Sequence, residues 1–241
     1  MSEFDQTLWA DVTFSKNYRE NADYYVQERA ELFRVMRSFF KRFVATTPGV
    51  SVCDLGCGDG ILCEHLFQED ESIQPTLVDG SREMLDAAKK RLSNHPACKY
   101  IQLPFSDLDS LAVGGKNYGL IISAFAIHHL SLSEKASLFQ TVHNLLADGG
   151  WFLNIDTVFP DDSIFTDWYY EHWQAWVDER DRAFDLKGAF KEISQQAREN
   201  PDNKLSPLGV QLELLRAAGL RSVDCHYKNG LFAVFGGRRI P

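Results

Sequence analysis

A glycine-rich loop directly after a short apolar run is the feature that most constrains this chain. Residues 52–60 read VCDLGCGDG: a β-prone run ends in Asp54, and three glycines then follow at alternate positions. Glycines this dense let a backbone approach a ligand closely. A dinucleotide-binding loop of the G-x-G-x-x-G type would need its third glycine where Ile61 stands. By pattern alone, the D-x-G-x-G-x-G spacing predicts a loop for another nucleotide-like ligand.

Strand-like and helix-like segments alternate along most of the chain. Short β-prone runs are predicted as strands and amphipathic runs as helices. The strands are expected at 50–55, 73–79, 99–103, 118–127 and 151–157, and the helices at 28–47, 61–68, 82–92 (capped by Ser81), 134–146 (opened by Ser133) and 208–218. Five strands that alternate with helices predict a parallel sheet covered on both faces.

The end of the chain breaks this alternation. Asn229-Gly230 separates two β-prone runs, 222–228 and 231–236, and Asn-Gly between such runs is typical of a hairpin. The last two strands should therefore pair antiparallel. The predicted fold class is α/β: a doubly wound, seven-stranded, mostly parallel sheet with an antiparallel last strand.

The chain divides into three predicted parts. A helical cap occupies residues 1–47, the doubly wound core comprises 48–158 and 207–241, and a helical insertion occupies 159–206. The insertion is rich in aromatic residues. Its stretch 161–202 holds 11 acids against 5 bases, which accounts for most of the formal net charge of -9.

Composition argues against several classes of protein. The acidic balance disfavours nucleic acid as a partner, because such partners select basic faces. The first residues lack a basic region followed by an apolar one, and nowhere do about 18 apolar residues run together, so we expect a cytoplasmic protein without a membrane partner. The five cysteines form no CxxC pair, which favours free thiols over a disulfide framework or a metal site. The sequence is compatible with a homodimer.

The glycine loop and the segment after it resemble the class I S-adenosylmethionine-dependent methyltransferases. VCDLGCGDG (52–60) is similar to their first motif, LVDGSREML (77–85) to their second, and the final hairpin to the reversed last strand of their seven-stranded sheet. The resemblance spans about residues 50–157 and 208–239. It implies a Rossmann-like methyltransferase core with S-adenosylmethionine as the cofactor.

The resemblance assigns the loop to the methionine end of that cofactor. Gly56 and Gly58, with Cys57 between them, would lie against the methionine moiety, which needs both acceptors and amide donors. Asp54 would hold the loop or the ammonium group. Alternatively, Asp54 only caps a helix.

The second motif is assigned to the nucleoside. Asp79, 25 positions after Asp54, would accept hydrogen bonds from both ribose hydroxyls, because a carboxylate has two oxygens. Gly80 and Met84 would flank the adenine. The alternative is that Asp79 is a turn residue.

One segment departs from the family pattern. An acid that meets the adenine amine usually follows the third strand, but Leu103 or Pro104 stands there. Asp107 is the nearest substitute in a shifted register, with Ser106 beside it, although it could be a surface acid. Phe105 could instead supply an apolar wall.

Two adjacent histidines follow the fourth strand, whose end faces the transferable methyl group in this fold. His128 and His129 are the candidate catalytic bases, because histidine exchanges protons near neutral pH. The alternative is that one of them packs under the loop or touches the cofactor. Ser123, Ala124 and Phe125 are expected to line the cofactor site.

The family leaves the choice of acceptor to the N-terminal segment and the insertion. The predicted acceptor pocket is aromatic, and its candidates are Tyr18, Tyr24, Tyr25, Trp168, Tyr169 and Trp173. If the insertion is helical, Tyr169, Trp173 and Trp176 share one face. Such a face could equally be the packing surface of a helical lid.

The predicted function is methyl transfer from S-adenosylmethionine to a small-molecule acceptor, with release of S-adenosylhomocysteine. An RNA or protein methyltransferase is one alternative. A regulatory protein that binds the cofactor without turnover is another.

Overall fold

The computed structural model describes residues 12–46, 48–112 and 117–241, so the first eleven residues of the predicted cap lie outside the description. In chain order the elements are α1 (Val12–Tyr25), α2 (Arg29–Phe43), β1 (Ser51–Leu55), α3 (Ile61–Phe67), β2 (Gln74–Asp79), α4 (Arg82–Arg91), β3 (Lys99–Gln102), η3 (Phe105–Asp107), α5 (Asp109–Ala112), β4 (Tyr118–Ala124), η4 (Ile127–His129), α6 (Leu132–Leu145), β5 (Leu146–Thr157), η5 (Ser163–Phe165), α7 (Thr166–Phe184), α8 (Ile193–Glu199), α9 (Leu208–Ala217), β6 (Arg221–Asn229) and β7 (Phe232–Arg238).

The strands form one seven-stranded sheet of order β3-β2-β1-β4-β5-β7-β6. The five strands β1 to β5 pair parallel to one another. The last strand, β7, is inserted between β5 and β6 and runs antiparallel to both. The predicted fold class is confirmed, and the strand order reverses between β1 and β4, where such sheets bind ligands at the carboxyl edge.

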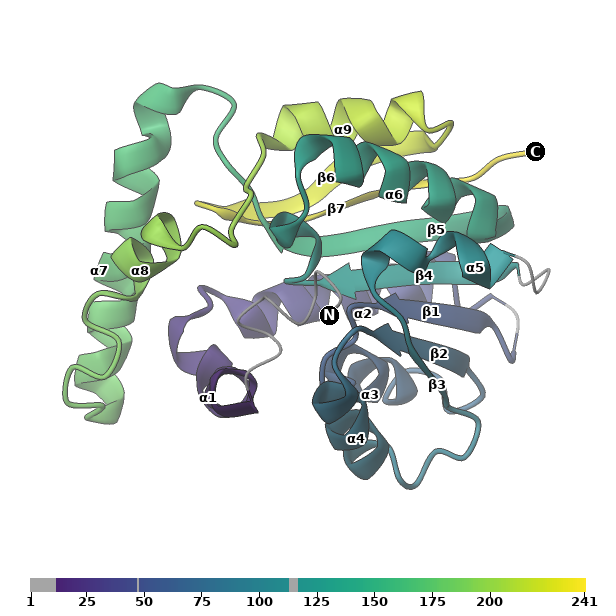
Figure 1. The fold of residues 1–241 in the computed structure, drawn as a ribbon, viewed down its shortest axis with the longest axis horizontal. Coiled ribbons are helices and arrows are strands. Elements are labelled where there is room, and N and C mark those ends of the chain that lie inside the picture. Colours follow the sequence, from purple (N-terminus) through teal and green to yellow (C-terminus); the bar gives the residue numbers. More distant parts are fainter. Residues whose placement is uncertain (1–11, 47, 113–116) are drawn as a thin grey trace.

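Helices cover both faces of the sheet (Figure 1). In this view α5, α6 and α9 lie on one face and α2, α3 and α4 on the other. Two apolar clusters correspond to these faces, one built around Leu66 and Leu77 and the other around Phe139 and Phe152, all of them buried. Parallel strands buried on both faces explain the continuous apolar runs in the sequence.

Two boundaries differ from the sequence prediction. The cap of α6 is Ser131 rather than Ser133: its hydroxyl accepts from the backbone of Glu134, whose carboxylate accepts in return from the Ser131 amide. The strand β5 begins at Leu146 rather than at the predicted residue 151, and it therefore includes the two glycines at 149 and 150. They lie in a register shift of the β4–β5 ladder, where a bulge is accommodated within the strand.

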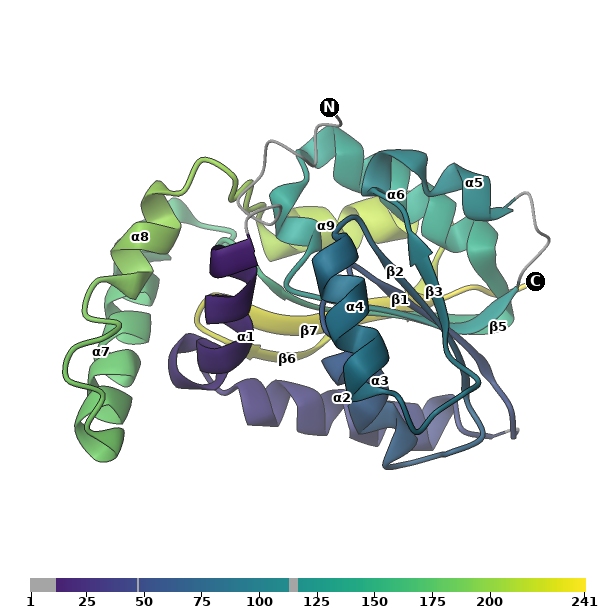
Figure 2. The ribbon, with the colours of Figure 1, turned by 60° about the horizontal axis from the view of Figure 1, so that its bottom comes forward.

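Helix α1 of the cap and helix α7 of the insertion pack against each other beside the carboxyl edge of the sheet (Figure 2). The indole of Trp173 in α7 donates to the Tyr25 carbonyl at 2.6 Å, and the indole of Trp176 donates to the Glu28 carboxylate at 3.1 Å. Trp173 and Trp176 therefore belong to a packing surface of α7, which agrees with the interpretation of this face as the packing surface of a helical lid. Within the described ranges, no helix is long and apolar enough to cross a membrane.

Candidate active site

The glycine loop leaves β1 with three glycines in the left-handed backbone region, where residues with a Cβ are strained. The space around the three glycines also differs. A Cβ on Gly56 would lie 2.5 Å from the Cβ of Ala126, and one on Gly60 would lie 3.0 Å from Leu92, whereas one on Gly58 would meet nothing within 4 Å. Gly56 and Gly60 thus permit close packing, and Gly58 faces open space.

This contrast predicts different effects of adding one methyl group. We expect Gly56→Ala to lower the free energy of unfolding by about 3 kcal/mol, because strain and overpacking combine. Gly58→Ala should cost only about 1 kcal/mol, since it suffers the backbone strain alone. Urea denaturation of both variants measures the difference, and equal losses would contradict the assignment of Gly56 as a packing position.

Asp54, the acid in β1 at the start of the motif, is fully buried beneath this loop. One carboxylate oxygen accepts from the Cys63 thiol at 3.5 Å. The other, Oδ1, has no hydrogen-bond partner among the described residues. Burial raises the pKa of Asp54 to about 8, and the nearby Asp79 adds to the rise. A buried oxygen without a partner at the wall of a cavity is a candidate acceptor for a ligand.

Asp79, at the end of β2, connects the two motifs. Its Oδ2 accepts from the Gly58 amide and its Oδ1 from the Ser81 amide, each at 2.8 Å. Burial raises the pKa of Asp79, and these two amide donors oppose the rise. Ser81 in turn caps α4 by accepting from the Met84 amide. The carboxylate is therefore held in one orientation, and each oxygen keeps a further lone pair for a ligand.

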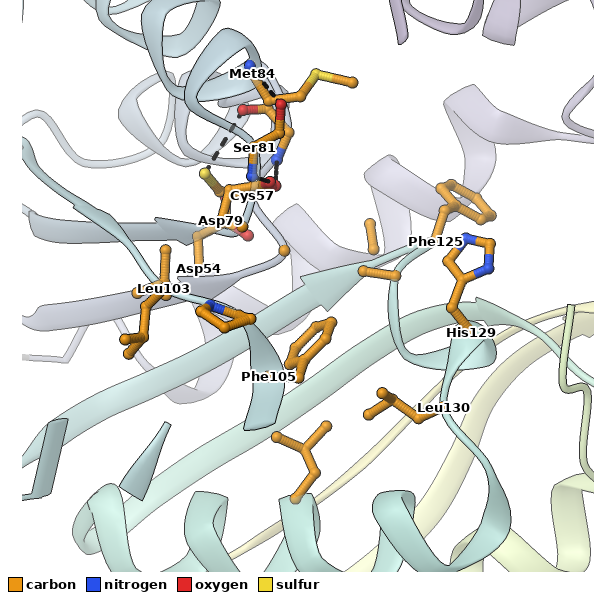
Figure 3. A pocket seen from close by; sticks show the side chains of 18 of the residues that line it. Asp54, Cys57, Asp79, Ser81, Met84, Leu103, Phe105, Phe125, His129 and Leu130 are labelled. Carbon is orange, nitrogen blue, oxygen red and sulfur yellow. Dashed lines mark hydrogen bonds between the residues drawn. The ribbon is translucent and has the colours of Figure 1, made fainter. Parts of the chain in front are cut away.

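These residues line one cavity of about 720 Å³ at the carboxyl edge of the sheet. Figure 3 shows Asp79, Ser81 and Met84 on one side of it and Phe125 and His129 on the other. Of the thirteen residues assigned to the cofactor from the sequence, eleven line the cavity: Asp54, Gly56, Cys57, Gly58, Asp79, Gly80, Met84, Phe105, Ser106, Ala124 and Phe125.

The other two lie outside the lining. The Ser123 hydroxyl is buried and donates to the Leu55 carbonyl at 2.7 Å, so it ties β4 to β1. Asp107 is exposed and accepts from the Ser106 hydroxyl at 3.0 Å. The short η3 turn directs Phe105 and Ser106 toward the cavity and Asp107 toward solvent, which fits the interpretation of Asp107 as a surface acid.

Phe125 stands in an unusual conformation. Its φ is 53°, and its amide donates to the Ile155 carbonyl at 2.9 Å. A bulky residue in the left-handed region is a genuine outlier, and such strain clusters at functional sites. The turn that begins here sends β4 into η4 and presents Phe125, Ala126 and His129 to the cavity.

The two histidines of η4 have different surroundings. His129 lines the cavity, and its Nδ1 lies 3.0 Å from the Asp202 carbonyl. Burial and the adjacent His128 ring hold the pKa of His129 well below its usual range. His128 is not in the cavity lining; its Nδ1 lies 2.6 Å from the buried Asp156 carboxylate.

The residues predicted to form an aromatic acceptor pocket lie away from this cavity. None of the described side chains Tyr24, Tyr25, Trp168, Tyr169 and Trp173 lines this cavity. Tyr24 and Tyr25 pack against Phe190 instead, Trp168 is 56% exposed, and Tyr169 accepts from the Lys228 ammonium. Tyr18 lies within α1, but its side chain is outside the described part of the chain. Among these residues, Tyr24, Tyr25 and Trp173 serve the contact between cap and insertion.

Other residues form the wall of the cavity beyond the cofactor motifs. Arg19 and Arg29 reach it from the cap, and Asp202 and Lys204 from the segment that returns from the insertion. No local pattern marks these four, because their positions depend on how distant segments dock. Ser133, Ser137 and Thr141 also line it at four-residue spacing on α6, a periodicity that could have identified them from the sequence.

The arrangement fits the cofactor that the motifs imply. Its ammonium needs an acceptor, and the buried Oδ1 of Asp54 lacks a partner among the described residues. Its ribose hydroxyls need two acceptors, and the Asp79 carboxylate is held in place for them. Its methionine backbone needs room beside the loop, and a Cβ on Gly58 would meet open space. Within the described residues, no cluster of His, Cys, Asp and Glu could hold a metal ion.

Comparisons with known proteins agree with this geometry. A family model described as a methyltransferase domain matches residues 52–150. A carboxy-S-adenosyl-L-methionine synthase of Methylococcus capsulatus is 27% identical over 83% of this chain and 80% of its own length. A ubiquinone/menaquinone biosynthesis C-methyltransferase of Desulfotalea psychrophila is 26% identical over 82% of this chain and 77% of its own length.

The fold has solved counterparts as well. The structure of an O-methyltransferase family protein from Burkholderia thailandensis superposes with a TM-score of 0.66 at 16% identity; the match covers 98% of this chain and 63% of that longer one. The fold, the two motifs, the matching domain model and the relatives all lead to one conclusion. The chain therefore contains a methyltransferase domain with the class I, S-adenosylmethionine-dependent fold, and its cofactor is S-adenosylmethionine.

Proposed function

We propose that this methyltransferase acts on a small organic acceptor and releases S-adenosylhomocysteine. The observation that carries the proposal is the cavity, which joins the cofactor residues to a wall formed by Phe125, His129 and the 202–204 segment. Its volume of about 720 Å³ falls in the range of small-molecule sites. A pocket of this size holds a cofactor and a compact acceptor, whereas a macromolecule would need an extended surface.

The charge of the chain supports the same choice. With a formal net charge of -9, it offers little attraction to the phosphates of RNA. The relatives' names refer to different products, so they support the cofactor and leave the acceptor open. RNA as the acceptor predicts binding of tRNA at low salt, and a purely regulatory protein predicts cofactor binding without turnover.

His129 is the proposed base on the acceptor side. The bound cofactor supplies a methyl group already activated by its sulfonium, so the protein must mainly orient the acceptor and exclude water. Where the acceptor is a hydroxyl or a carbon acid, a base must also take its proton. His129 lines the cavity, and its lowered pKa keeps the ring neutral and able to accept a proton at neutral pH.

The adjacent histidines provide a test with an internal control. We expect His129→Ala to lower kcat by about 100-fold and to leave the affinity for S-adenosylhomocysteine within a few fold. His128→Ala should lower the free energy of unfolding by roughly 2 kcal/mol, because the buried Asp156 carboxylate loses its hydrogen bond with the His128 ring, 2.6 Å away. Unchanged kcat in His129→Ala would exclude it as the base.

The acceptor class itself is tested by a turnover assay. The wild-type protein, S-adenosylmethionine and a panel of phenols, carboxylic acids, amines and thiols are incubated together, and S-adenosylhomocysteine is quantified. We expect acceptor-dependent product with at least one small-molecule class. Binding of S-adenosylhomocysteine without turnover across the panel, or turnover only with RNA or protein, would contradict the proposal.

A further inference from the structure

Lys135 in α6 is a fully buried cation that does not line the cavity. A buried ammonium is costly unless each of its three hydrogens finds an acceptor. Here they do: the Nζ donates to the Leu130 carbonyl at 2.6 Å, the Lys204 carbonyl at 2.5 Å and the Ser206 hydroxyl at 3.1 Å. The side chain is a three-way connection between segments.

The segments it joins are far apart in sequence. Leu130 directly follows His129 in the turn after β4 (Figure 3). Lys204 and Ser206 belong to residues 200–206, the return segment that leads from the insertion back to α9. A second bond joins the same two segments, because the Lys204 amide donates to the His128 carbonyl at 2.8 Å. Lys135 therefore fastens the return segment onto the histidine turn.

This fastening determines what His129 meets. Its Nδ1 lies 3.0 Å from the carbonyl of Asp202, two residues before the clamped Lys204. A carbonyl only accepts, so Nδ1 must carry the hydrogen, and in the neutral ring Nε2 is then the proton-accepting nitrogen. The neutral histidine side chain in water prefers the opposite tautomer, with the hydrogen on Nε2. The position of the Asp202 carbonyl therefore decides which nitrogen of His129 can act as a base.

We propose that Lys135 is a positioning residue: by clamping the return segment onto the histidine turn, it holds the Asp202 carbonyl against His129 and selects Nε2 as the proton-accepting nitrogen. The inference rests on the proposed role of His129 as the base. Lys135 itself contacts neither of the reacting groups. It acts through Leu130, Lys204 and Ser206, and these contacts hold the return segment beside the histidine turn.

The test is the tautomer of His129 in the free protein, read from nitrogen chemical shifts in a ¹⁵N-histidine-labelled sample and assigned with His129→Gln. The wild type should show the Nδ1–H form. Lys135→Met, which removes all three donors at similar length, should shift His129 toward the Nε2–H form. It should also raise hydrogen exchange at the Lys204 amide by at least tenfold.

Two further variants separate positioning from general destabilisation. Val142→Ala truncates another fully buried residue of α6, seven positions after Lys135. It should leave the His129 tautomer and the hydrogen exchange of the Lys204 amide as in the wild type. Ser206→Ala removes one of the three acceptors and should raise Lys204 exchange a few fold, which keeps the test open if Lys135→Met does not fold. Wild-type tautomer and exchange in the clamp variants would overturn the inference.

These outcomes are independent of methyl transfer, because the tautomer is measured without cofactor or acceptor. Failure to find an acceptor would count against the proposed function and leave the tautomer result standing. An unchanged tautomer would remove Lys135 from the mechanism and leave the assignment of the cavity intact.

Discussion

Asp79→Ala is expected to weaken binding of S-adenosylhomocysteine by about a thousandfold. Hydrogen bonds to a charged group are worth about 1.5 to 3 kcal/mol each, and the variant loses the two proposed to the ribose. It also releases the Gly58 and Ser81 amides, each held at 2.8 Å, so the glycine loop and the start of α4 lose their common anchor. Isothermal titration calorimetry at neutral pH measures the change.

Asp86→Ala is the matched control. This acid lies in α4 just after the second motif, its side chain is 58% exposed, and it pairs with Lys89. Because Asp86 does not line the cavity, its removal should leave the affinity unchanged within about twofold. An affinity within threefold of the wild type for Asp79→Ala would show that this carboxylate does not bind the ribose.

Asp54→Asn is expected to stabilise the cofactor-free protein at alkaline pH while weakening the binding of S-adenosylhomocysteine. Burial raises the pKa of Asp54 from its ordinary 3.8 to about 8 in the folded chain. Between these values the folded state holds a proton that the unfolded chain has lost, so the free energy of unfolding falls as pH rises. The loss is complete above about pH 8 and is at most about 6 kcal/mol.

The neutral amide removes this dependence on pH. Urea denaturation without ligand at pH 5 and pH 8.5 should show a decline for the wild type that is largely absent in Asp54→Asn, with Asp86→Asn behaving as the wild type. Conversely, wild-type affinity for S-adenosylhomocysteine should rise as pH approaches 8, because the ligand's ammonium favours the carboxylate. Parallel pH profiles for wild type and Asp54→Asn would contradict this role.

Local sequence patterns predicted most of the fold. The runs that became the strands contain residues that favour β-structure, and the Asn229-Gly230 turn correctly indicated the antiparallel end. Such signals are local, since periodicity and turn chemistry depend on neighbouring residues. Two boundaries were predicted wrongly, the cap of α6 at Ser131 and the start of β5 at Leu146. At each place the local sequence allows more than one boundary, and tertiary contacts select one of them.

The cofactor side of the cavity was likewise predictable, for a topological reason. In a parallel sheet the loops after β1 and β2 must meet at the carboxyl edge, so Asp54 and Asp79 had to come together once the strands were identified. Both line the cavity, as do Gly56 and Gly58 between them. The acceptor side has no such rule, because its wall comes from the cap and the return segment.

The sequence by itself thus determined the sheet, the glycine loop at its edge and the carboxylate that anchors that loop. Only the tertiary structure decided what the adjacent histidines do: in the tight η4 turn, His128 pairs with Asp156 while His129 lines the cavity. It also decided that Trp173 and Trp176 of α7 pack against the cap. The physical reason is the same in both cases, because the direction of a side chain at a junction depends on contacts between segments far apart in the chain.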